Sequence, residues 1–184
     1  MLELFLTGEL EDRYFAEQPL PEGPKDVVST TQPLFWFPAQ VDGVVIRLTG
    51  VMTCLASVAS ILLYFFWYEL VGKCIAYYLL LDFVLRFLGG SRFSPIGRVA
   101  MVLATSAKKQ PRVGRPKQFA SVCGISFSLL GSVFYAMPVP YSDYIGAAFI
   151  GMLGMATGME GFLDFCLGCV FFRIFVHLGL FAKD

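Results

Sequence analysis

About twenty consecutive residues without a charged side chain, positions 48–67, are the strongest constraint on how this chain folds. As an α-helix this segment would be roughly 30 Å long, about the thickness of the hydrocarbon core of a bilayer. It ends in aromatic residues at positions 64–68, as expected where a spanning helix meets the membrane interface. Since 57% of the 184 residues are hydrophobic and only 15% are charged, the sequence predicts an integral membrane protein.

Three further apolar segments predict membrane crossings. The second crossing is expected over residues 74–88, the third over 119–137 and the fourth over 144–165. A last apolar segment, 170–181, is shorter and contains an arginine and a histidine four residues apart. It therefore predicts an interfacial tail and not a fifth crossing.

A short helix is expected between the second and third crossings. Ser94 is a helix-capping residue type, and Pro95 is of the type favoured at the first helical position. Apolar residues then recur near helical spacing over 96–107, which is typical of a helix lying on the membrane surface. The expected fold class is therefore an all-α membrane protein with four transmembrane helices, a short interfacial helix between the second and third, and an extended N-terminal arm.

The distribution of charge divides the chain into an arm and a membrane domain. Residues 1–43 hold eight acidic and two basic side chains and several prolines, and residues 44–184 contain the four-helix transmembrane domain. Such an arm is expected to be largely disordered on its own. Its Phe35, Trp36 and Phe37 have two interpretations, insertion into the lipid interface or docking on a partner. Its first residues lack the basic start of a signal peptide.

Positive charge is concentrated over residues 86–117, which hold eight Lys or Arg side chains and no acid. Because basic loops resist translocation, the 89–117 loop is expected on the cytoplasmic-type side, matrix or stromal in an organelle. Four crossings then place both chain termini on that side as well. These basic residues flank membrane segments, so they do not indicate nucleic-acid binding.

Small residues in the last two predicted crossings indicate close helix packing. Lipid provides no hydrophobic drive between helices, and small side chains let two backbones approach. Gly154 and Gly158 have the GxxxG spacing. The residues expected at helix contacts, within the bundle or against a partner, are Gly124, Gly131, Gly151, Gly154, Gly158 and Gly161.

Cys166 and Cys169 form a CxxC motif at the end of the fourth crossing. Such a pair can close a disulfide, take part in metal binding, or simply pack. Arg173, one turn beyond, would favour a reactive thiolate, whereas the nearby acids Glu160 and Asp164 would oppose it. A metal site would need further Cys or His ligands. The structural interpretation is favoured, and redox chemistry remains the functional alternative.

Two sets of acidic residues predict structural ion pairs. Asp82 precedes Arg86 by four residues, the favourable order for a pair on one helix face. Glu160 and Asp164 are expected on a common helix face. An intramembrane acid can also handle protons or cations, but positions near helix ends favour ion pairing. The candidate arginine partners of the second set are Arg92, Arg98 and Arg173.

Four motifs occur in order along the chain, at 44–50, at 81–86 with 90–95, at 115–120, and at 160–162 with 165–169. Together they resemble a bacterial membrane family known as domain of unknown function 4395. The resemblance covers residues from about 41 to 180 and implies the family's fold and topology, with no settled activity. Residues 1–40 look like an extension added to the family region.

The function expected first is non-catalytic: an integral membrane accessory subunit that anchors to and stabilises a larger photosynthetic or respiratory complex. One alternative is a membrane thiol–disulfide or sulfur-handling protein that uses Cys166 and Cys169. The other is a small solute or ion transporter acting as a homo-oligomer. It ranks last because no span is expected to carry a polar stripe along its full length, and no inverted repeat is evident.

Expected partners are the membrane and other integral membrane subunits. No cofactor is required and bound lipids are expected. A haem or pigment is not indicated, and His177, the single histidine, is favoured as an interfacial polar residue over a metal ligand. The expected location is an organellar inner or thylakoid membrane, or a bacterial inner membrane.

Overall fold

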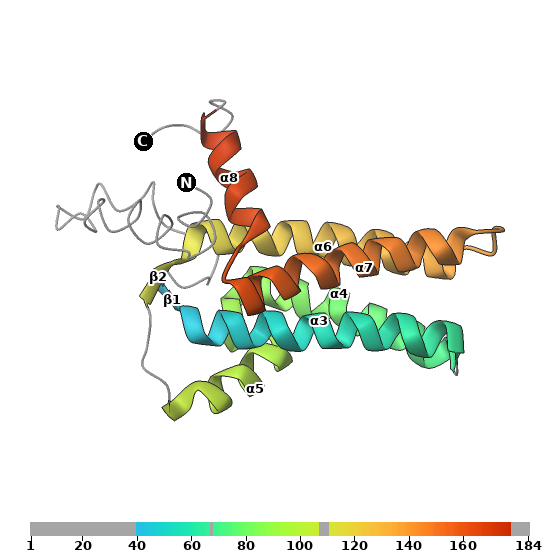
Figure 1. Cartoon of the computed structure of the whole chain (residues 1–184), viewed down its shortest axis with the longest axis horizontal. Coiled ribbons are helices and arrows are strands. Elements are labelled where there is room, and N and C mark those ends of the chain that lie inside the picture. The colour runs from blue at the N-terminus through green and yellow to red at the C-terminus, as the bar shows by residue number, and fades with distance from the viewer. Residues whose placement is uncertain (1–39, 67, 107–110, 178–184) are drawn as a thin grey trace.

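The computed structural model describes residues 40–66, 68–106 and 111–177, and this part of the chain is mostly helical (Figure 1). Four long helices lie side by side as a bundle. They are α3 (Gly43–Phe66), α4 (Glu69–Gly89), α6 (Gly114–Ala136) and α7 (Ser142–Leu163). The shorter elements are β1 (Gln40–Asp42), the 3₁₀ turn Gly90–Arg92, α5 (Pro95–Leu103), the 3₁₀ turn Ala104–Ser106, β2 (Pro111–Val113) and α8 (Leu167–His177).

The bundle has two unlike ends, which we call the strand end and the loop end (Figure 1). At the strand end, β1 pairs antiparallel with β2, with Gln40 opposite Val113 and Asp42 opposite Pro111. Helix α5 packs against α3 there, and α8 begins there. At the loop end, short connections join α3 to α4 and α6 to α7. The last residues of the predicted arm are therefore paired with the chain just before α6.

Three helices are long and apolar enough to cross a membrane, by length and composition: Gly43–Phe66, Lys117–Ala136 and Ser142–Leu163. They correspond to the predicted first, third and fourth crossings and support an integral membrane protein. Helix α4 covers the predicted second crossing with 21 residues. It also carries four charged side chains, so length and composition do not establish it as a span.

Helices α3 and α7 approach closely because α7 lacks side chains where the two meet. A Cβ atom on Gly161 would lie 2.7 Å from the backbone N of Val51, and one on Gly154 would lie 2.9 Å from Cβ of Ser57. Gly151 is different, since its Cβ would meet its nearest neighbour at an ordinary 3.7 Å. Most glycines expected at helix contacts thus lie at contacts inside the bundle, whereas Gly151 leaves room for a side chain.

Two glycines of α6 allow side chains of the neighbouring helices to approach closely in the same way. Gly124 faces the ring of Phe83 on α4, and a Cβ on Gly131 would lie 2.7 Å from Cδ1 of Ile150 on α7. Phe83 and Ile150 are themselves buried. The large side chains of two helices therefore fill the spaces that these glycines leave.

Helix α3 carries a buried polar stripe along its length, which corrects the expectation that no span has one. Its members are fully or almost fully buried: Thr49, Thr53, Ser57, Ser60 and Tyr64. Thr49, Thr53 and Ser57 each donate a hydrogen bond to the carbonyl one turn back. Ser60 donates to the carbonyl of Gly72 on α4 at 2.8 Å. These small hydroxyl groups satisfy themselves on or beside their own helix, so they pack as small residues in an apolar segment.

The start of α5 follows the predicted capping pattern. The side chain of Ser94 accepts a hydrogen bond from the backbone N of Gly97 at 2.8 Å, and Pro95 is the first helical residue. Ile96 and Ala100 face the bundle, whereas Val102 and Leu103 are exposed. The helix is thus apolar toward the bundle, and its outer side carries both apolar residues and the exposed Arg98.

We expect the Gly161→Ala variant to lose about 1–3 kcal/mol of unfolding free energy, because the new methyl group would meet fixed backbone atoms of α3. Gly151→Ala, the matched control on the same helix, should stay within about 0.5 kcal/mol of the parent. The measurement is reversible unfolding of both purified variants in mild detergent. Equal losses at the two positions would contradict the close α3–α7 contact.

Candidate functional site

The thiol pair lies at the strand end, where the chain passes from α7 into α8. Cys166 immediately precedes α8, and Cys169 lies in its first turn. The carbonyl of Cys166 accepts hydrogen bonds from the backbone N of Cys169 at 3.1 Å and of Val170 at 3.2 Å. The backbone N–H of Cys169 also points at Sγ of Cys166, at 3.4 Å. Cys166 is therefore the N-terminal capping residue of α8, with its sulfur directed at the helix end.

Both cysteines are buried, with exposed fractions of 4% for Cys166 and 2% for Cys169. The beginning of α8 packs against α6 at Gly168, where a Cβ atom would lie 2.6 Å from Cα of Ala120. Cys123 lies one turn further along α6. The CxxC pair therefore lies where α8 meets α6.

Asp82 and Arg86 form an ion pair at the strand end, between Oδ2 and Nη2 at 2.5 Å. Asp82 is fully buried, and its Oδ1 accepts hydrogen bonds from Oγ of Ser94 at 2.6 Å and from the backbone N of Ile96 at 3.3 Å. Arg86 also donates to Oγ1 of Thr53 at 2.8 Å. This network joins α4 to α3 and to the start of α5, and it satisfies the buried carboxylate.

Glu160 has a partner that the sequence did not predict. Its Oε1 lies 2.8 Å from Nζ of Lys117, at the beginning of α6. The Lys117 side chain is only 8% exposed, so the pair is largely buried. Of the arginines expected there, Arg98 instead donates from Nε to the carbonyl of Arg92 at 2.8 Å. The sequence predicts Lys117 at the end of the 89–117 loop, and the structure places it inside α6.

Asp164 does not share a helix face with Glu160, which corrects the second part of that prediction. Helix α7 ends at Leu163, and Asp164 follows in the left-handed conformation with φ of 58°. A small polar residue tolerates this conformation better than most. Asp164 therefore turns the chain from α7 toward Cys166.

Several predicted residues lie outside what the structure describes. Phe35, Trp36 and Phe37 precede the described ranges, and the side chains of Arg173 and His177 are not described. Among the described residues, no three His, Cys, Asp or Glu side chains are grouped so as to hold a metal ion.

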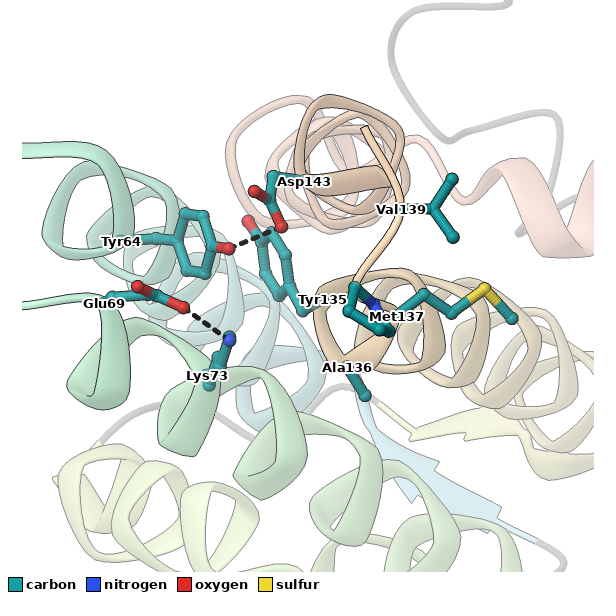
Figure 2. Close-up of a pocket in the computed structure, with 9 residues that line it drawn as sticks. Tyr64, Glu69, Lys73, Tyr135, Ala136, Met137, Val139 and Asp143 are labelled. Atoms are coloured by element: carbon teal, nitrogen blue, oxygen red, sulfur yellow. Dashed lines mark hydrogen bonds and ion pairs between the residues drawn. The ribbon is translucent and has the colours of Figure 1, made fainter. Parts of the chain in front are cut away.

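A pocket at the loop end was not predicted (Figure 2). It has a volume of about 320 Å³ and is lined by side chains of α3, α4, α6 and α7 and by the 136–139 connection. Tyr64 donates to Oδ1 of Asp143 at 2.5 Å, and Lys73 pairs with Oε1 of Glu69 at 2.5 Å. The rings of Tyr64 and Tyr135 stack with centroids 4.3 Å apart. Tyr64 had been counted among the interfacial aromatics, which hid its inward position.

The site residues that the structure describes lie within a region of the chain that matches a known family. The sequence model of the family described as "Domain of unknown function (DUF4395)" matches residues 41–177. The chain belongs to this family. Comparison with curated proteins and with solved structures found no match. The DUF4395 region includes the thiol pair, both buried ion pairs and the loop-end pocket, so these are features of the family region and not of the preceding arm.

We expect Asp82→Asn to cost about 3 kcal/mol or more of unfolding free energy, because it leaves the largely buried Arg86 without its counter-charge. The matched control is Glu69→Gln, which removes the acid from an exposed pair of the same i,i+4 spacing on the same helix. That loss should be about 0.5 kcal/mol or less. The unfolding free energies of the two variants are compared in a denaturing-detergent titration. A loss at Asp82 no larger than at Glu69 would show that the buried network adds nothing to stability.

Proposed function

We propose that this protein is a membrane thiol–disulfide exchange protein in which Cys166 attacks and Cys169 resolves. The observation that carries this function is the position of Cys166 at the N-terminus of α8, with its sulfur aligned on the backbone N–H of Cys169. Backbone N–H groups at a helix N-terminus stabilise negative charge. A sulfur held there is suited to attack as a thiolate, and the second thiol lies one turn away to complete the exchange.

The reaction requires a disulfide-bearing partner and balances as follows. The Cys166 thiolate attacks one partner sulfur, the partner's S–S bond breaks, and its other sulfur leaves and takes up a proton. The Cys169 thiolate then attacks Sγ of Cys166, breaks the mixed disulfide and releases the second partner thiol. The partner gains two electrons and two protons, and Cys166 and Cys169 become a disulfide. A second partner that carries two thiols can reduce this disulfide by the reverse reaction, which restores the thiols of Cys166 and Cys169.

The Cys169→Ser variant is expected to accumulate a mixed disulfide between Cys166 and the partner, because the resolving thiol is missing. The adduct should appear on a non-reducing gel as a larger species that collapses with reductant. Cys74→Ser is the matched control, since Cys74 is exposed on α4 and belongs to neither end of the exchange. It should give no adduct.

Absence of an adduct, together with full function in the Cys166→Ser/Cys169→Ser double variant, would overturn the thiol–disulfide function. The pair would then be structural.

We also propose that α4 crosses the membrane, giving four crossings with the strand end on the cytoplasmic-type side and α5 in the interface. The side-by-side arrangement of α4 with α3 and α6 supports this (Figure 1). So does the pairing of its charges, since Lys73 bonds Glu69 and Arg86 bonds Asp82. Exposed Arg92 and Arg98 add to the positive charge at the strand end.

Single cysteines introduced by Arg92→Cys and Val139→Cys, in a variant without native cysteines, test this topology. An impermeant maleimide applied from the extracytoplasmic side should label the cysteine at position 139 at once. The one at position 92 should be labelled only after permeabilisation, because it lies at the opposite end of the bundle. Labelling of both from one side would contradict four crossings.

A second candidate function is the accessory subunit of a larger membrane complex. Helix α8 supports it, because this apolar helix leaves the bundle at a steep angle (Figure 1). Its Phe171 and Ile174 are about half exposed, at 51% and 45%. Comigration with a large stoichiometric complex on a native gel, without any thiol adduct, would favour this function. Transport is not supported, since the α3 hydroxyl groups mostly donate to carbonyls of their own helix.

A further inference from the structure

The loop-end pocket contains a buried polar group that lacks a partner. Tyr135 is 1% exposed, and its hydroxyl makes no hydrogen bond in the part of the chain that the structure describes. An unpaired buried polar group costs about 1–3 kcal/mol, so native proteins rarely retain one without a reason. The pocket volume of about 320 Å³ far exceeds the roughly 10–15 Å³ that one water needs. The pocket beside this hydroxyl therefore has room for an occupant larger than a single water.

The charged side chains of the pocket indicate which charge the occupant carries. Two carboxylates, of Asp143 and Glu69, face a single ammonium, that of Lys73. Lys73 is paired with Glu69, and no ion pair joins Asp143 to another described residue. Asp143 is bonded instead to the neutral hydroxyl of Tyr64. The pocket thus has an excess negative charge centred on Asp143, which a cation would balance.

The aromatic side chains add a preference for a cation of a particular kind. Figure 2 shows the hydroxyl groups of Tyr64 and Tyr135 turned toward the Asp143 carboxylate. The two rings stack on one another with centroids 4.3 Å apart, so a ligand would meet their hydroxyl oxygens and not the stacked faces. A primary ammonium has three N–H donors, enough to bond both a carboxylate and a phenol oxygen.

We propose that the loop-end pocket binds a primary ammonium group, held by the Asp143 carboxylate and the Tyr135 hydroxyl. Two sources share this chemistry, the headgroup of an ethanolamine phospholipid and a free small amine. The lipid is favoured by the surroundings, because Phe65, Phe66 and Tyr144 are exposed at this end, as at a membrane interface. Lys73 would then lie beside the lipid phosphate.

Native mass spectrometry of the delipidated full-length protein tests the site with phosphatidylethanolamine and phosphatidylglycerol. We expect at least about tenfold tighter binding of phosphatidylethanolamine, since phosphatidylglycerol lacks the ammonium. Tyr135→Phe should weaken that binding about 3- to 10-fold without lowering the unfolding temperature, because the lost hydroxyl has no protein partner. Asp143→Asn should weaken it further. Tyr144→Phe is the matched control, and binding should not change.

Competition by ethanolamine distinguishes the two sources. Displacement of the lipid by millimolar ethanolamine would show that the ammonium alone is recognised, and lack of displacement would show that the whole headgroup is required. Equal affinity for the two lipids, or unchanged binding by Tyr135→Phe, would overturn the proposal. The Tyr135→Phe result tests the proposed ammonium site even if Asp143→Asn fails to fold.

Discussion

Lipid gives no hydrophobic gain when one apolar helix packs against another, so this bundle must be held by close packing and by buried polar contacts. The α3–α7 contact meets the first requirement. Glycines on α7 remove the side chains that would separate the two backbones, and they face Ser57, Cys54 and Val51 of α3. The second requirement is met mainly at the strand end, where Asp82 with Arg86 and Lys117 with Glu160 form largely buried ion pairs.

The buried polar groups at the two ends of the bundle differ in how many hydrogen-bond partners they have. This difference distinguishes a structural role at the strand end from the proposed binding role at the loop end. At the strand end, Asp82 receives hydrogen bonds from a serine, a backbone N–H and Arg86, so its charge is fully compensated. At the loop end, the side-chain hydrogen bond between Asp143 and the described residues comes from the neutral hydroxyl of Tyr64, and the hydroxyl of Tyr135 has no partner in that part of the chain. A satisfied network fixes the positions of helices, whereas an incomplete one leaves interactions for a ligand.

The sequence predicted the features that depend on neighbours within one helix. Uncharged runs located three spans, Ser94 with Pro95 located the start of α5, and the four-residue spacing placed Asp82 beside Arg86. Contacts between distant positions were missed. Lys117 meets Glu160 across 43 residues, and Tyr64 meets Asp143 across 79. Both separations are far longer than the three- or four-residue spacing that brings two side chains together on one helix. No local sequence pattern could therefore indicate these contacts. The β1–β2 pairing was missed for the same reason.

The burial of Cys166 and Cys169 places a further demand on the proposed thiol exchange. A partner sulfur must approach Sγ of the attacking cysteine in line with the bond it forms, yet these side chains are 4% and 2% exposed. Helix α8 packs chiefly on α6 and only slightly on α7. Moving α8 away from α6 would therefore break mainly this one helix contact, while the α3–α7 and α3–α4 contacts stay intact. The glycine contact at Gly168 suits such a movement, since no large side chain interlocks there with Ala120.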